Sequence, residues 1–367
     1  MWHVYRQITG LQRYQTVVLT HRRENAEQFP FANVITIPKA KTRFFRRLWC
    51  KQICNAPQQI YRGEALRIFN ALDEAGAELL HIYFGHIGVY LLPLISIWPR
   101  PTVVSFHGAD AGVDMHHQAH RQAMVELFQS VDAVLARSQS LLNALRALGC
   151  PEDKLFLQRT GIPLSQWKFS ERSWPSDGQW HIVQASRLIP KKGLKSTLRT
   201  FALFSNEHPG SRLTLAGEGP LRGELLALAS QLGLEKQVSL PGFLTQKQLQ
   251  NLYSTAHLFI HPSEMSGDGN QEGVPNSMLE AMATGLPVVA TLHGGVPEAV
   301  EDGLSGLLLP EGDVEGLYNA LLRFAQDQDF YKCAAKSAAQ SVRERFAQNQ
   351  QVQVLEACYA RLLAGKR

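Results

Sequence analysis

Two glutamates, Glu272 and Glu280, stand eight positions apart in a stretch whose pattern predicts a loop, a helix and a buried strand. A loop that opens a helix points unpaired backbone N–H groups and the positive end of the helix dipole outward, which suits a phosphate-bearing ligand. If both glutamates are helical, they lie roughly 12 Å apart along the axis. They could then hold sugar hydroxyls and ribose at the two ends of one elongated ligand. The alternative is that both are solvated charges on an ordinary capped helix.

The entry to this predicted helix has the residues that such a turn needs. Gly273 and Pro275 shape the loop, and Asn276 or Ser277 can cap the first helical turn.

The same stretch resembles the signature of retaining GT-B glycosyltransferases of the group 1 (family 4) type, similar to those of exopolysaccharide and colanic acid biosynthesis. The resemblance covers most of the chain from about Glu78 onward. In that family two glutamates flank the loop that binds a nucleotide-sugar. The resemblance implies that Glu272 contacts the donor sugar and Glu280 the ribose, with Gly273, Asn276 and Ser277 at the nucleotide-sugar between them.

Two cations follow the first predicted strand of the second half of the chain. Fixed positive charges at a strand end, here Arg187 and Lys192, can neutralise a diphosphate and stabilise the charge that grows as it leaves. They match the diphosphate-binding Arg and Lys of the family, and Gly193 follows the Lys as the family pattern requires. Basic loop residues are commonly just solvated. Lys191 is expected to be a bystander.

A glycine turn follows the next predicted strand. Gly217 and Gly219 lack the further glycine of a dinucleotide fingerprint, since Arg222 stands at that position, so this turn is weak evidence for NAD. In the family the turn lies beside the nucleotide and the base packs nearby. The resemblance therefore implies nucleotide contacts for Gly217 and Gly219, and for Phe243 and Leu244 at the base.

A histidine in the first half of the chain follows another predicted strand. His107, with Gly108 and Asp110 after it, resembles the family's His-Gly motif beside the donor sugar. The resemblance implies that His107 contacts the donor sugar and supports the transition state, while Asp110 orients it or binds acceptor. A lone histidine is more often a satisfied structural residue.

Composition limits the class of protein. A length of 367 residues and 45% apolar content suggest a globular protein of about two domains. The N-terminus lacks the long apolar core of a signal peptide, and the longest apolar run, from Ile87 to Trp98, is broken by Pro93. We therefore expect a cytoplasmic protein. Its five cysteines show no CxxC spacing, and its histidines form no convincing metal-ligand set, so no metal is expected.

Positive charge is concentrated in the first half of the chain. Residues 1–168 carry 19 Lys and Arg against 12 Asp and Glu, whereas residues 169–367 carry 18 against 20. No nucleic-acid-binding motif accompanies this charge, so nucleic acid is not expected as a partner. The segment from Arg43 to Lys51 interleaves cations with aromatic side chains. It could contact the inner face of the cell membrane near a lipid-linked acceptor, or it could be a partly buried helix with a solvated basic face.

Short apolar runs alternate with helical stretches along the whole chain. The expected strands are 16–19, 34–37, 79–83, 102–106, 133–136, 181–186, 212–216, 238–240, 258–261 and 288–290, and the expected helices include 61–75, 194–206, 221–232 and 246–255. Buried strands that each precede a helix indicate parallel sheets covered on both faces. The predicted fold class is α/β, as the GT-B arrangement of two doubly wound Rossmann-like domains that face each other across a cleft.

The predicted domains are an acceptor-binding domain at 1–168, a nucleotide-sugar-binding domain at 169–347, and a C-terminal helix at 348–367 that packs back on the first domain, as the resemblance implies. The polar segment from Lys168 to Gly178 is the expected linker. The family usually begins with a strand and a glycine-rich loop, yet this chain starts with a predicted helix and Gly10 stands alone. Either the first strand is missing from this chain or the resemblance weakens there, and diphosphate binding from that side stays open.

The expected function is metal-independent, retaining transfer of a hexose-type sugar from a nucleotide-sugar, such as a UDP- or GDP-hexose, to a hydroxyl of a saccharide or lipid-linked acceptor in cell-surface polysaccharide biosynthesis. The expected catalytic residues are His107, Arg187, Lys192 and Glu272, with no cofactor beyond the donor substrate. Two alternatives stay open, namely a catalytically silent GT-B subunit that binds a partner or lipid, and a sugar-nucleotide epimerase. The donor base and sugar, the acceptor and the oligomeric state are not predicted.

Overall fold

A computed structural model describes residues 2–39, 56–108, 117–265 and 272–365. The basic segment from Arg43 to Lys51 and Asp110 therefore lie outside the described residues. The chain divides into two compact units. The first unit comprises Met1–Gly161 with Asn349–Arg367, and the second unit comprises Ile162–Gln348.

The second unit contains a six-stranded parallel sheet in the order β12-β11-β10-β7-β8-β9. Its strands are β7 (His181–Ala185), β8 (Arg212–Ala216), β9 (Val238–Gly242), β10 (Leu258–His261), β11 (Val288–Thr291) and β12 (Gly306–Leu309). Its helices are α8 (Leu194–Glu207), α9 (Arg222–Gln231), α10 (Gln246–Thr255), α11 (Asn276–Ala283), α12 (Val314–Gln326) and α13 (Gln328–Arg345), with short 3-10 helices at Pro190–Lys192 and Val296–Glu298.

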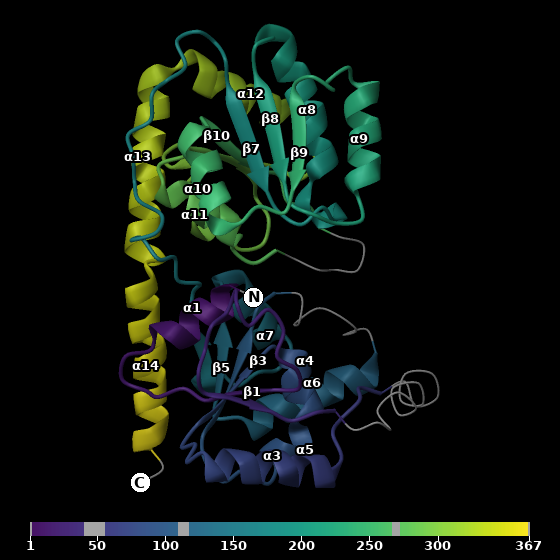
Figure 1. The fold of residues 1–367 in the computed structure, drawn as a ribbon, viewed down its shortest axis with the longest axis vertical. Coiled ribbons are helices and arrows are strands. Elements are labelled where there is room, and N and C mark those ends of the chain that lie inside the picture. Colours follow the sequence, from purple (N-terminus) through teal and green to yellow (C-terminus); the bar gives the residue numbers. More distant parts are fainter. Residues whose placement is uncertain (1, 40–55, 109–116, 266–271, 366–367) are drawn as a thin grey trace. The chain divides into compact units, whose positions relative to one another are not determined.

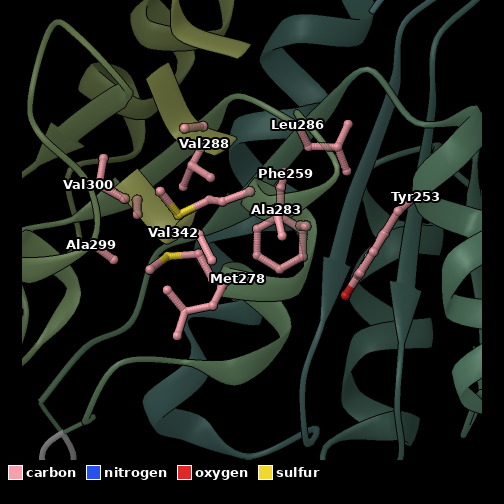
Figure 2. Close-up of a cluster of buried hydrophobic side chains, with 14 of the residues drawn as sticks. Tyr253, Phe259, Met278, Ala283, Leu286, Val288, Ala299, Val300 and Val342 are labelled. Atoms are coloured by element: carbon pink, nitrogen blue, oxygen red, sulfur yellow. The ribbon is translucent and has the colours of Figure 1, made fainter. Parts of the chain in front are cut away.

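The central strands β7, β10 and β11 are buried on both faces, whereas the edge strand β9 has two exposed residues. All five residues of β7 are buried, and neighbours along it belong to opposite cores. Ile182 packs in the core formed with α8, α9 and α12, whereas Val183 packs in the core formed with α10, α11 and α13 (Figure 1). Figure 2 shows part of the core that contains Val183. In it, Met278 of α11 and Val342 of α13 lie near Phe259 of β10. Two-sided burial explains why β10 and β11 are apolar over most of their length, and it makes the second unit doubly wound.

The first unit contains a four-stranded parallel sheet in the order β3-β4-β5-β6 and a separate parallel pair, β1-β2. The strands are β1 (Val18–Thr20), β2 (Val34–Thr36), β3 (Leu80–Tyr83), β4 (Thr102–Phe106), β5 (Ala133–Ala136) and β6 (Leu155–Leu157). The helices are α1 (Trp2–Gly10), α3 (Arg62–Glu74), α4 (Gly85–Tyr90), α5 (Leu92–Ile95), α6 (Gln118–Ser130), α7 (Gln139–Ala147) and the C-terminal α14 (Gln348–Ala364), with a 3-10 turn at Glu152–Lys154.

Helix α14 contributes to the core of the first unit. Leu355 and Tyr359 are buried against Val103 of β4 and Leu135 of β5. The carboxylate of Glu356 accepts hydrogen bonds from the backbone N–H groups of Gln12 (2.6 Å) and Arg13 (2.8 Å). The end of the chain is thus tied to the segment that follows α1.

The division between the units falls before the expected linker. Ile162 pairs with Ala347 in an isolated parallel bridge, and Trp167 is buried in the core around α11. These contacts place the residues between Ile162 and Lys168 with the second unit, whereas they were expected in the first domain.

Candidate active site

The candidate residues of the second unit gather where its strands end. Arg187 and Lys192 follow β7, Gly217 and Gly219 follow β8, and Glu272 lies between β10 and α11. Because the carboxyl ends of parallel strands meet at one edge of the sheet, this edge is where a ligand is expected.

Lys192 and Glu272 form a buried ion pair at this edge. The ammonium nitrogen of Lys192 lies 2.6 Å from Oε2 of Glu272, and that of Lys191 lies 3.5 Å from the same oxygen. The side chains of the three residues are only 8–13% exposed. Lys191 is therefore a buried partner of the same carboxylate, and the expectation that it is a bystander is wrong.

The charges of this cluster support one another. Burial alone would raise the pKa of Glu272, but the ammonium groups of Lys192 and Lys191 outweigh it and lower the pKa to about 2. Burial lowers the pKa of Lys192, and the Glu272 carboxylate opposes that shift. The carboxylate is ionised at neutral pH, and two cations face it.

The backbone around Lys192 is fixed by local packing. Gly193 has a φ of 60°, and a Cβ built on it would lie 1.7 Å from the carbonyl oxygen of Pro262, so only glycine fits. The carbonyl oxygen of Lys192 accepts a hydrogen bond from the side chain of Gln184 (2.7 Å), which in turn accepts one from Thr197 (2.7 Å). The ammonium group is thus carried by a rigid turn.

Arg187 differs from Lys192 because its side chain is exposed. Its charge contributes to the lowered pKa of Lys192, after burial and the charge of Lys191, so the cations of this edge interact electrostatically. An exposed guanidinium beside a buried ammonium can reach an anion in solvent.

The glycine turn after β8 lies directly against the segment that carries Arg187. A Cβ on Gly217 would lie 1.8 Å from the carbonyl oxygen of Ser186, and one on Gly219 would lie 2.4 Å from that of Leu188. The backbone N–H of Gly217 also donates to the carbonyl of Gly242 (2.8 Å), the residue before Phe243.

Phe243 is 59% exposed, which is unusual for an aromatic side chain and leaves its ring available for stacking. Leu244, by contrast, is partly buried and packs on the core around α11. The two residues expected at the base thus differ in their access to a ligand.

The start of α11 differs from the expectation. The helix begins at Asn276 with Pro275 as its N-cap, and no side-chain hydrogen bond caps it. The hydroxyl of Ser277 instead donates to the carbonyl of Ala185 (2.5 Å), so it ties the helix start to the end of β7. The expected capping by Asn276 or Ser277 is therefore wrong.

The two glutamates do not share a helix. Glu272 precedes α11, so the helical spacing expected for the pair does not apply. Glu280 lies within α11 at 5% exposure, and Glu272 is held in the buried ion pair. Neither is a solvated helix charge, which excludes that alternative.

His107 belongs to the first unit and lies among aromatic rings. Its ring centroid is 4.4 Å from that of Phe84, 4.9 Å from that of His3 and 6.0 Å from that of Tyr83. Burial, followed by the charge of Arg137, lowers its pKa far below the usual value. The ring is therefore neutral at physiological pH.

The surroundings of His107 contain polar residues that the sequence did not single out. The Nδ1 atom of His81 lies 2.5 Å from the hydroxyl of Tyr359, and its Nε2 atom bonds the hydroxyl of Ser105. The buried guanidinium of Arg137 donates to the side chain of Gln7 on α1 (2.6 Å). Arg137 follows directly after an apolar strand, and this polar residue at a strand end was the available signal.

Three residues of the second unit were also missed, namely His261, His293 and Glu311. His261 ends β10 with no exposed surface, and burial lowers its pKa to about 3. The ring of His293 bonds the carboxylate of Glu311 (2.6 Å) and the backbone of Glu272 (2.9 Å).

Among the described residues, no three His, Cys, Asp or Glu side chains are grouped so that they could hold a metal ion. None of the helices in the described ranges has the length and hydropathy to cross a membrane.

Comparison with protein families covers both units. The model of "Glycosyl transferases group 1" matches residues 165–341, and that of "Glycosyltransferase Family 4" matches residues 2–166.

Curated relatives extend this match. The putative colanic acid biosynthesis glycosyltransferase WcaL of Escherichia coli (strain K12) is 32% identical over 280 residues, which are 75% of this chain and 68% of the relative. The amylovoran biosynthesis glycosyltransferase AmsK of Erwinia amylovora is 32% identical over 254 residues, 69% of this chain and 62% of the relative.

Solved structures show the same fold. HepE of Anabaena, crystallised with UDP and glucose, has a TM-score of 0.78 at 21% identity, with 98% of this chain and 95% of that chain covered. A glycosyltransferase from Rickettsia africae has a TM-score of 0.77 at 14% identity, with the same shares covered. The fold is GT-B, with two Rossmann-like domains. The chain belongs to the group 1 (family 4) glycosyltransferases.

Proposed function

We propose that the protein is a retaining glycosyltransferase that moves a hexose-type sugar from a UDP- or GDP-sugar to a hydroxyl of a saccharide or lipid-linked acceptor. The observation that carries the proposal is the buried Lys192–Glu272 pair at the carboxyl edge of the second sheet. Relatives named for colanic acid and amylovoran biosynthesis support a role in exopolysaccharide assembly.

The second unit is proposed to hold the donor. The exposed Arg187 and the ammonium group of Lys192 bind the diphosphate, and Phe243 stacks on the base beside the Gly217 turn. Lys192 has three N–H donors, so it can bind a phosphate oxygen while it keeps its bond to Glu272. Glu272 accepts hydrogen bonds from hydroxyls of the sugar.

Further donor contacts follow the family pattern. Gly219 lies with Gly217 at the nucleotide, Leu244 lies near the base, and Glu280 contacts the ribose. The backbone N–H groups of Gly273, before α11, and of Asn276 and Ser277, in its first turn, face the diphosphate. The buried position of Glu280 requires the ribose to approach the helix closely.

The proposed reaction breaks the bond between the anomeric carbon and the diphosphate, whose oxygen keeps the electron pair. The acceptor oxygen bonds to the anomeric carbon on the same face, and its proton passes to the departing phosphate. Lys192 and Arg187 stabilise the negative charge that develops on the diphosphate. The ring of His107, in the first unit, is neutral, so it can take part in hydrogen bonds without adding positive charge.

The central test is the Glu272→Gln variant. A thermal-shift screen of UDP, GDP, ADP and their sugars identifies the donor, because a ligand that binds the folded state raises its stability. With that donor, Glu272→Gln should bind the nucleotide and lose transfer by about a hundredfold or more, since a charged acceptor for sugar hydroxyls is gone.

Glu315→Gln, at an exposed position of α12, is the control and should transfer normally. Unchanged turnover in Glu272→Gln would refute the assignment. Absence of any nucleotide binding would favour a silent subunit instead. Product formation without acceptor would indicate an epimerase.

A further inference from the structure

The carboxylate of Glu311 is linked by hydrogen bonds to the residues that flank 266–271, directly to Met265 and through His293 to Glu272. The Oε2 atom of Glu311 accepts a hydrogen bond from the backbone N–H of Met265 (2.7 Å), and its Oε1 atom bonds Nδ1 of His293 (2.6 Å). The Nε2 atom of His293 in turn accepts the backbone N–H of Glu272 (2.9 Å). Met265 and Glu272 are thus both fixed by the His293–Glu311 pair.

The hydrogen bonds define the protonation of this pair. A backbone N–H can only donate, so Nε2 of His293 carries no proton and the ring proton sits on Nδ1. Nδ1–H then donates to Glu311. Burial alone would raise the pKa of Glu311, but the bonds from His293 and Met265 lower it, so the carboxylate is ionised. The side chain of His293 is only 1% exposed, so water has little access to its ring, whereas the side chain of Glu311 is 34% exposed.

Glu272 is therefore held at several atoms. Its N–H donates to His293, its carbonyl oxygen accepts from the backbone N–H of Gly295 (3.3 Å), and its carboxylate pairs with Lys192. His293 and Gly295 both lie in the turn after β11, whereas Glu311 follows β12. Two neighbouring strands thus determine where the Glu272 backbone lies.

We propose that His293 and Glu311 are positioning residues for the transfer reaction, because they fix the backbone of Glu272 and so the direction of its carboxylate. The inference rests on the proposed function, in which Glu272 contacts the donor sugar. Neither residue touches the substrate. A shift of about 1 Å in a group that contacts the substrate can reduce the rate by about a hundredfold, so this support matters for catalysis.

Two substitutions of His293 each keep one of its two hydrogen bonds, either the bond to Glu272 or the bond to Glu311. In His293→Gln the amide oxygen reaches the place of Nε2 and can still accept the N–H of Glu272. In His293→Asn the amide nitrogen takes the place of Nδ1 and can donate only to Glu311. Glu311→Gln keeps the shape of the side chain but leaves one acceptor oxygen, whereas Met265 and His293 each bond a separate oxygen of Glu311.

The experiment measures kcat and KM for the donor, the melting temperature, and hydrogen exchange of the peptide that contains Met265 and Glu272. His293→Asn and Glu311→Gln should lower kcat roughly tenfold to a hundredfold, with donor KM nearly unchanged and faster exchange at this peptide. His293→Gln should retain most of the activity. Glu315→Gln should match the wild type in every measurement.

The outcomes distinguish this inference from the proposed function. Wild-type kcat in folded His293→Asn and Glu311→Gln would overturn the positioning role, while a loss in Glu272→Gln would still support the function. Equal losses in His293→Asn and His293→Gln, with a lowered melting temperature in both, would show a purely structural role. Wild-type turnover in Glu272→Gln would refute the proposed role of Glu272, and with it the inference about His293 and Glu311.

Discussion

At the scale of single residues, the decisive feature is a buried carboxylate with two ammonium groups around it. Burying charges is costly unless their partners compensate, and removing one partner of a buried pair leaves an uncompensated charge. Here the described contacts give Glu272 two cationic partners, Lys192 and Lys191. The same arrangement makes protein stability depend on pH.

We expect the ionised Glu272 to stabilise the folded state near neutral pH and progressively less as the solution is acidified. Its pKa is about 2 in the folded protein, against an ordinary value of 4.5. A carboxyl group whose pKa is lowered by folding adds stability above pH ~4.5, and this is lost as the pH falls toward 2. Glu272→Gln should therefore cost on the order of 2–3 kcal/mol of unfolding free energy near pH 7 and less than about half of that near pH 3.

Urea unfolding at both pH values measures this difference. The exposed Glu315→Gln control should show the same small effect at each pH. An equal cost for Glu272→Gln at pH 7 and pH 3 would show that the ion pair does not lower the pKa of Glu272.

At the scale of elements, the site depends on tight turns that follow the strands. Gly193 ends the 3-10 helix that carries Lys192 and is the N-cap of α8. Its backbone lies close to the backbone of Pro262, which follows β10. A side chain there would push apart the segments that follow β7 and β10. The geometry of the cation site therefore depends on a residue that has no charge.

Gly193→Ala should lower the unfolding free energy by at least about 2 kcal/mol and weaken nucleotide binding, because the added Cβ meets a backbone oxygen and φ is positive. Gly223→Ala in α9 is the matched control, since a Cβ there meets nothing within 4 Å. It should raise stability by about 0.5–1 kcal/mol. Chemical denaturation and calorimetric nucleotide titration test both variants, and equal effects would contradict this account of the turn.

At the scale of the whole molecule, the sequence predicted the doubly wound architecture but not every strand. Strands such as β4 and β8 have five residues each and were predicted with their observed bounds. The strand β6 has three residues, and β12 is a glycine followed by three leucines, so neither pattern distinguishes strand from helix.

The part of the site that the sequence did not predict depends on hydrogen bonds between residues far apart in the chain. Motif spacing was enough to single out Lys192 and Glu272, which are in contact in the structure. The partnership of His293 with Glu311 and with Glu272 joins residues from different strand ends, and no local pattern encodes it. The burial of Lys191 likewise depends on packing that a run of two lysines does not reveal.

The uneven charge of the chain leads to a prediction about membranes. Residues 1–168 hold 19 Lys and Arg against 12 Asp and Glu, and the segment from Arg43 to Lys51 mixes cations with aromatic rings. Each basic residue near an anionic bilayer contributes about 1 kcal/mol. We expect the protein to sediment with vesicles that contain phosphatidylserine, and less so as salt increases.

The triple variant Arg43→Glu, Arg46→Glu and Arg47→Glu should lower the vesicle partition coefficient by at least about tenfold. The matched control changes three exposed lysines of the second half, Lys236, Lys247 and Lys332, to Glu. It alters the net charge equally, so a general charge effect would weaken binding in both variants. A loss confined to the first triple locates the contact in the Arg43 to Lys51 segment, whereas unchanged sedimentation of that variant excludes the segment as the membrane contact.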